Sequence, residues 1–85
     1  MAKPSRLGRR VKAFRLQRNM TQEELRQASG ISRAVIAGLE SGLRQSVMLE
    51  TVEKLARALH TDLNQLTGFD ALGDVDEIEL VAASA

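Results

Sequence analysis

Apolar residues recur at three- and four-residue steps along most of the chain, which is the spacing of one face of an α-helix. In the first such stretch, Leu7, Val11 and Phe14 line one side of a helix from about residue 6 to residue 18. Four later stretches share the pattern, and their apolar positions are Leu25 and Ala28, then Val35, Ile36 and Leu39, then Leu49, Val52, Leu55, Ala56 and Leu59, and last Leu63 and Leu66. The pattern predicts five helices between residues 6 and 67 around one core.

The second and third helices have clear start and stop signals. Thr21 is followed three residues later by Glu24, the spacing of a capping box, and Gly30 can end the helix with a positive φ. Ser32 then caps the third helix and Gly42 closes it. Because so few residues join them, the two helices must cross steeply and expose the N-terminal half of the third. The segment is therefore predicted to be a helix-turn-helix.

Weaker signals bound the other helices. Asn19 tolerates the left-handed conformation and can end the first helix. Ser46 is a candidate N-cap of the fourth helix, and Asp62 followed by Gln65 predicts a cap for a short fifth helix that ends before Gly68.

Composition excludes several kinds of site. The chain has 85 residues, enough for one small domain, and no Cys, so a disulfide framework, a thiolate metal site and a thiol nucleophile are excluded. His60 is the single histidine, and no metal or cofactor is expected. The absence of an apolar run of about 18 residues predicts a soluble, cytoplasmic protein without a membrane partner. Two aromatic residues, Phe14 and Phe69, are too few to stack single-stranded bases.

Charge is distributed unevenly along the chain. Residues 1–60 hold all twelve Lys and Arg against five acids, a net charge of +7, whereas residues 61–85 hold six acids and no base. A basic front half is the expected footprint of a polyanion such as double-stranded DNA, although basic helices can also be no more than a soluble surface. The acidic end must then point away from that ligand or bind something else.

The order of these features resembles a known family. The residues that carry the resemblance are LGRRVKAFRLQRNMTQEELRQASGISRAVIAGLESG, then LETVEKLARAL and DLNQL, together spanning residues 7–68. They are similar to the phage-repressor and Cro-like (Xre-type) helix-turn-helix domains. The resemblance implies an all-α, compact five-helix bundle of the lambda-repressor-like DNA-binding class. It also implies a homodimer that binds a two-fold operator and regulates transcription, with repression the expected output.

The resemblance also assigns residues by position. Positions that contact the sugar-phosphate strands are occupied by Thr21, Gln22, Ser32, Arg44 and Gln45. Positions that face base edges are occupied by Arg33, Ala34, Ala37 and Gly38. In these domains the residue at Gln22 also steadies the recognition helix, and Arg15 and Glu40 match a pair that joins the first helix to the third.

The chain departs from the family pattern at two places. Val47 stands where a proline usually precedes the fourth helix, which should loosen the loop slightly. Arg33 is the only long polar side chain at the base-facing positions, so few hydrogen bonds to base edges are expected. Ala34 or Ala37 could meet a thymine methyl group, and Gly38 would let the backbone approach closely. The remaining selectivity would then come from DNA shape or from the N-terminal arm. Alternatively, the small residues are merely tolerated and Arg33 contacts phosphate without selectivity.

Outside the resemblance lie two terminal segments. Residues 1–5 are expected to form a flexible basic arm, and residues 69–85 an acidic C-terminal segment. Charged and apolar residues alternate over 77–80, which suits a short β-strand, so Ile78 and Leu80 are expected to pair with a second subunit and cover Phe69. A disordered acidic tail and a strand that binds a toxin are the competing interpretations.

Three classes of function remain at this stage. A dimeric, DNA-binding transcriptional regulator is favoured. An antitoxin that binds DNA through the same domain and a toxin through its acidic end is the alternative. An enzyme is not expected, because the sequence offers no nucleophile with a base, no metal set and no phosphate-cradling glycine loop.

Overall fold

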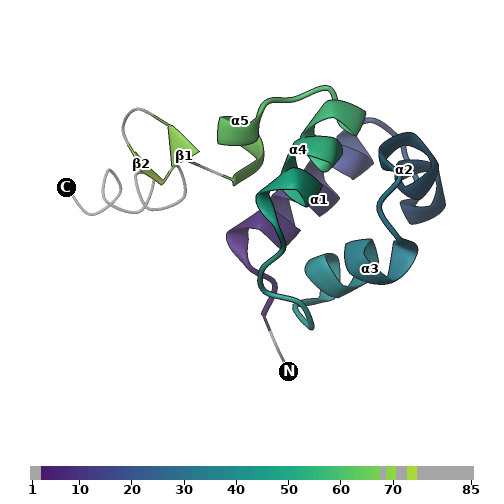
Figure 1. Cartoon of the computed structure of the whole chain (residues 1–85), viewed down its shortest axis with the longest axis horizontal. Helices are drawn as coiled ribbons and strands as arrows, with labels where there is room; N and C mark the ends of the chain where they lie inside the picture. Colours follow the sequence, from purple (N-terminus) through teal and green to yellow (C-terminus); the bar gives the residue numbers. More distant parts are fainter. Residues whose placement is uncertain (1–2, 68, 71–72, 75–85) are drawn as a thin grey trace.

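The five predicted helices are all present in the computed structural model, which describes residues 3–67, 69–70 and 73–74 (Figure 1). In chain order the elements are α1 (Arg6–Gln17), α2 (Gln22–Ser29), α3 (Arg33–Ser41), α4 (Leu49–Ala58), α5 (Leu63–Thr67), β1 (Phe69–Asp70) and β2 (Gly73–Asp74). The all-α helix-turn-helix architecture is confirmed. Ile78 and Leu80, expected in a dimerisation strand, lie outside the described residues.

Every helix contributes at least one residue to a single apolar core. The buried members are Val11, Leu25, Ile31, Ile36, Leu39, Val52, Leu55, Ala56, Leu59 and Leu66. Burying a large aliphatic side chain contributes about 1.5–3 kcal/mol to the free energy of unfolding. Because the net stability of a domain is only about 5–15 kcal/mol, the loss of one large core side chain would remove a sizeable part of it. Phe14 and Val47 are among the partly buried residues packed against this core.

Two of the predicted core residues are on the surface instead. Leu49 is 61% exposed because it is the first residue of α4, one turn before the packed stripe that begins at Val52. Ala28 is exposed as well, and it lines a surface hollow together with Lys54 and Arg57. Its single methyl group faces long charged side chains of α4, so it reaches only the rim of the core.

The caps of α2 and α3 follow the sequence. Thr21 Oγ1 accepts a hydrogen bond from Glu24 N at 3.0 Å, and Glu24 Oε1 accepts one from Thr21 N at 2.8 Å. Ser32 Oγ accepts from Val35 N at 3.2 Å. Gly30 and Gly42 end the two helices with φ of 76° and 92°, values that favour glycine.

The predicted cap at Ser46 is wrong. Met48 is the N-cap of α4 and makes no side-chain cap hydrogen bond, while its carbonyl accepts from Thr51 N at 3.0 Å and Val52 N at 3.2 Å. The chain stays non-helical through Val47, whose side chain packs on the core, so the helix begins too late for Ser46 to cap it. The cap at Asp62 is present, since Asp62 Oδ1 accepts from Gln65 N at 2.7 Å.

Two helices end on non-glycine residues in the left-handed region. Asn19 has φ of 56° and His60 has φ of 54°. After each of them, the next amide donates to a carbonyl five residues back, from Met20 N to Arg15 O at 3.0 Å and from Thr61 N to Ala56 O at 2.9 Å. These are Schellman-type ends, and the sequence predicted only the one at Asn19.

A short antiparallel ladder follows α5. Phe69 is paired with Asp74 and Asp70 with Gly73, so β1 finds its partner β2 within the same chain. The sequence had predicted a strand only over residues 77–80, which lie outside the described residues. In Figure 1 this ladder lies on the side of the bundle away from α3, which separates the backbone of two acidic positions, Asp70 and Asp74, from the helix-turn-helix.

Candidate nucleic-acid interface

Helix α3 has one face packed on the core and one face open to solvent. Ile36, Leu39 and Glu40 are buried. The open face carries residues at positions i, i+3, i+4 and i+7, which are Ala34, Ala37, Gly38 and Ser41. Residues at this spacing share one side of a helix, so α3 presents a narrow strip of small side chains.

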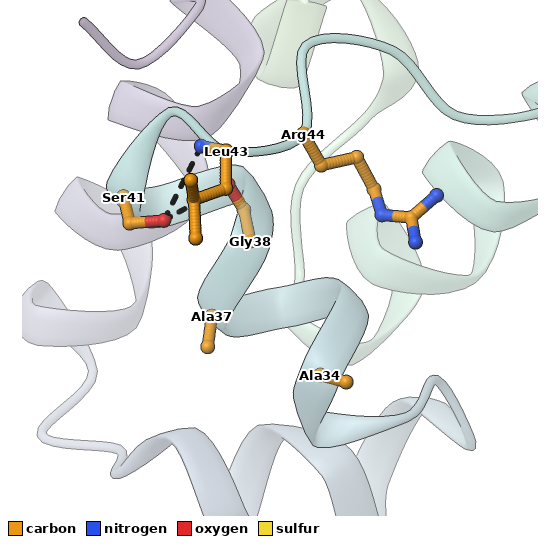
Figure 2. Close-up of a pocket in the computed structure, with 6 residues that line it drawn as sticks. All are labelled: Ala34, Ala37, Gly38, Ser41, Leu43 and Arg44. Atoms are coloured by element: carbon orange, nitrogen blue, oxygen red, sulfur yellow. Dashed lines mark hydrogen bonds between the residues drawn. The ribbon is translucent and has the colours of Figure 1, made fainter. Parts of the chain in front are cut away.

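An open groove of about 690 Å³ runs along that strip (Figure 2). Its remaining walls come from Leu43 and Arg44, in the loop that follows α3. The loop folds back on the helix, since Gly38 O accepts hydrogen bonds from Gly42 N at 3.1 Å and Arg44 N at 2.9 Å. A methyl group on Gly38 would lie 3.2 Å from Arg44 Cβ, so glycine allows this close approach. Three of the predicted base-facing positions therefore line one concave surface.

Arg33 lies beside this groove but does not line it. It is the first residue of α3 and is exposed. The hydrogen bond from Arg26 is the largest cause of the lowered pKa of Glu23, and the positive charge of Arg33 contributes the smallest part. Arg26 Nε donates to both carboxylate oxygens of Glu23 at 2.9 Å. The Glu23 carboxylate is thus already bound by Arg26 within α2. The side chain of Arg33 is exposed to solvent at the start of α3.

A buried ion pair fixes α3 to α1. Arg15 Nε and Nη2 donate to the two carboxylate oxygens of Glu40 at 2.8 and 2.9 Å, and both residues are 8% exposed. Arg15 Nη1 also donates to Met20 O at 2.7 Å. The hydrogen bond to Glu40 is the largest cause of the raised pKa of Arg15. Such a two-bond pair sets distance and orientation together.

Gln22 joins the same network from α2. Its side-chain Nε2 donates to Glu40 Oε1 at 3.2 Å. The sequence did not predict this contact, because Gln22 and Glu40 are 18 residues apart and no local pattern links them. One carboxylate therefore receives hydrogen bonds from α1 and α2, and α3 is positioned by both. A phosphate contact by Gln22 stays a prediction.

The other residues expected at the sugar-phosphate strands are also placed. Thr21 and Ser32 are exposed, with their side-chain oxygens accepting the cap hydrogen bonds already described. Arg44 is exposed, and Gln45 Nε2 donates to Lys3 O at 2.9 Å and Gly42 O at 2.7 Å. Gln45 thereby links the start of the described chain to the loop after α3.

Sequence reasoning missed two groove residues, Ser41 and Leu43. Ser41 could have been found, because it continues the i, i+7 repeat from Ala34. Leu43 could be noticed only as a leucine directly after the helix-ending Gly42, outside any apolar stripe. It is 86% exposed.

The described residues hold neither a metal-binding cluster nor a membrane-spanning helix. Among the described residues, no group of three or more His, Cys, Asp or Glu is placed to hold a metal ion. Within the same part of the chain, every helix is too short or too polar to cross a membrane.

Known proteins match most of this chain. The family described as Helix-turn-helix matches residues 11–66. An uncharacterized HTH-type transcriptional regulator of Archaeoglobus fulgidus is 38% identical over 61 residues, which cover 72% of this chain and 84% of that protein. The control protein C.BamHI of Bacillus amyloliquefaciens is 32% identical over 71 residues, covering 82% and 86%.

A third relative is longer. The immunity repressor protein of Bacillus phage phi105 is 32% identical over 73 residues, or 86% of this chain, but the match covers 50% of the repressor. The chain therefore spans about half the length of that relative.

Solved structures agree on the fold. The restriction-modification controller protein C.AhdI from Aeromonas hydrophila superposes with a TM-score of 0.67 at 34% identity, covering 72% of this chain and 91% of that one. The complex of SinR and SinI proteins gives 0.70 at 20% identity, covering 92% and 77%, and supports the fold alone.

Proposed function

The chain belongs to the helix-turn-helix family of DNA-binding regulators, and we propose that it is a sequence-specific transcriptional repressor that binds double-stranded DNA as a homodimer. In this proposal α3 enters the major groove and α2 lies across its edge. The expected base-facing residues are Arg33, Ala34, Ala37 and Gly38. No catalytic step is assigned to the chain.

The observation that carries this proposal is the open face of α3. A helix in a single domain normally packs its apolar residues inward and covers the rest with long polar side chains. Here the outward strip is made of alanine, glycine and serine, which lets another surface approach the backbone closely. A B-DNA major groove is about 12 Å wide and admits one helix, so the strip matches that ligand in shape.

Charge favours the same ligand. Arg33 and Arg44 are exposed at the start of α3 and just after it. Glu40, the acid nearest to the end of α3 in sequence, is buried against Arg15 and so presents no open negative charge there. A basic rim around an uncharged strip suits phosphate contacts at the edges and base contacts in the middle.

The geometry of paired helix-turn-helix domains on DNA supports the proposed homodimer. One recognition helix covers only a few base pairs, and two copies related by a two-fold axis place their helices in successive major grooves. Half-site centres are then about 10 base pairs, or about 34 Å, apart. No feature of the described residues favours the antitoxin alternative.

Selection of bound sites from a random double-stranded DNA pool tests the proposal. We expect a two-fold repeat with about 10 base pairs between half-site centres. The matched variants are Ala34→Glu and Ala13→Glu, because both residues are exposed alanines within helices, one on α3 and one on α1. Ala34→Glu should abolish enrichment and Ala13→Glu should preserve it. Unimpaired binding by Ala34→Glu would place the interface elsewhere.

A further inference from the structure

Leu43 is the most exposed of the large apolar side chains that the structure describes, at 86%, and it stands beside the strip on α3. It lines the same groove as Ala34 and Ala37 (Figure 2). A solitary exposed leucine needs no explanation. A leucine that completes the wall of a groove on a recognition helix is different, because it adds apolar surface where the ligand is expected.

The backbone around Leu43 is held in place rather than loose. Gly42 takes a left-handed conformation with φ of 92°, and Gln45 Nε2 donates to its carbonyl at 2.7 Å. Leu43 N donates to Ser41 Oγ at 3.3 Å, and the same hydroxyl donates to Gly38 O at 3.3 Å. Arg44 N is bonded to Gly38 O at 2.9 Å on the other side. The backbone position of Leu43 is thus held by hydrogen bonds before any ligand arrives, so on binding only its side chain has to be ordered.

The chemistry of the groove selects one feature of DNA. Ala34, Ala37 and Leu43 offer methyl groups, and the hydroxyl of Ser41 is already bonded within the loop. Among the groups that base pairs present in the major groove, the C5 methyl of thymine is the apolar one. The exposed Arg33 and Arg44 complement the phosphates on either side.

We propose that Leu43 and Ala37 form an apolar seat for a thymine C5 methyl group, which makes Leu43 a specificity-determining residue. This inference rests on the proposed function, since it assumes that α3 enters the major groove. Selectivity at that base pair then comes from shape and burial of the methyl group, and Arg33 supplies hydrogen bonds at a different position.

Single replacement of thymine by deoxyuridine tests the seat. The replacement removes only the methyl group and leaves the pairing and hydrogen-bonding groups unchanged. On a site obtained by selection, we expect the wild-type protein to lose about three- to tenfold in affinity at one or two thymines per half-site, the amount expected for one buried methyl group. Other thymines should give no change.

A protein variant then identifies the residue. Leu43→Ala should weaken binding to thymine DNA by a similar factor and should no longer distinguish thymine from deoxyuridine at that position. Leu16→Ala is the matched control, because Leu16 is 55% exposed on α1 and does not line the groove. It should keep the full wild-type discrimination. Both leucines are exposed, so neither change should unfold the protein, which thermal melting followed by circular dichroism verifies.

The thymine-methyl seat and the proposed DNA-binding function would be contradicted by different results. If no deoxyuridine affects the wild-type protein, or if Leu43→Ala discriminates as well as wild type, the methyl seat is wrong while specific DNA binding stands. If the random pool yields no enriched site at all, the proposed function fails and the seat fails with it.

Discussion

Arg15 and Glu40, 25 residues apart in sequence, are joined by two parallel hydrogen bonds beneath α3. Gln22 donates to the same carboxylate at 3.2 Å, so α1, α2 and α3 meet at one acid. The buried pair of Arg15 and Glu40 lies under the recognition helix, on the side away from the groove. The pair can therefore set the angle of α3 without touching DNA.

Breaking this pair from one side should destabilise the fold strongly. Arg15→Met leaves the buried Glu40 carboxylate without its ion-pair partner, and Glu40→Gln does the same to the Arg15 guanidinium. Each change should therefore lower the free energy of unfolding by about 3 kcal/mol. The double variant should lose clearly less than the sum, because no charge is left uncompensated. Urea denaturation of all four proteins measures the cycle. Additive losses would mean that the pair contributes no coupling.

Gly8 should be intolerant of even a methyl group. A Cβ on Gly8 would lie 2.0 Å from the carbonyl oxygen of Leu39, so α1 must move away from α3. We expect Gly8→Ala to cost about 1–3 kcal/mol in unfolding free energy. Gly38→Ala is the control, since its Cβ would lie 3.2 Å from Arg44 Cβ and 3.8 Å from Arg44 N, a far milder contact than the one at Gly8, and its stability should change by less than about 1 kcal/mol. Equal melting temperatures for Gly8→Ala and wild type would contradict this packing.

His60 offers a stabilising change. It ends α4 with φ of 54°, a conformation that costs an ordinary side chain energy and costs glycine none. His60→Gly should therefore raise the free energy of unfolding by about 0.5–1 kcal/mol, net of the entropy that glycine adds to the unfolded chain. Gly30→Ala, at φ of 76° with open space around it, should lower stability by about 1 kcal/mol for the same reason. A destabilised His60→Gly protein would show that the imidazole makes a contact of greater value.

The helices could be predicted from the sequence because their signals are local. The three- and four-residue apolar spacing and the caps at Thr21, Ser32 and Asp62 each act within one or two turns. Ser46 failed as a cap because a tertiary contact, the packing of Val47 on the core, decides where α4 begins. A local sequence pattern cannot show that a tertiary contact overrides a capping signal.

For a related reason, the interface could be predicted only in part from the sequence. Residues on α3 could be assigned because the resemblance to a known family supplies their positions, but the contact of Gln22 with Glu40 and the placement of Leu43 depend on how separate elements pack. Neither leaves a periodic trace in the sequence. Conversely, Ala28 fitted an apolar stripe and is nevertheless exposed, because α4 presents charged side chains opposite it.

The proposed dimer can be tested by shortening the chain. If Ile78 and Leu80 clasp the second subunit near Phe69, a protein truncated after Gly73 should become monomeric or dimerise far more weakly, and its DNA affinity should fall with it. Light scattering over a concentration series measures the first effect and a DNA titration the second. A truncated protein that stays dimeric and binds DNA fully would move the dimer contact out of the acidic segment.

The central claim is that α3 lies in the major groove with Arg33 at a base edge. Dimethyl sulfate footprinting tests it most directly, because the reagent methylates guanine N7 in the major groove and adenine N3 in the minor groove. On a selected site we expect N7 protection in two patches about 10 base pairs apart, with adenine N3 between them reactive. Arg33→Ala should lose about 1–3 kcal/mol of affinity and unprotect one guanine per half-site, whereas Arg44→Ala should weaken all sequences alike. Protection confined to adenine N3, or an Arg33→Ala footprint identical to wild type, would contradict the account.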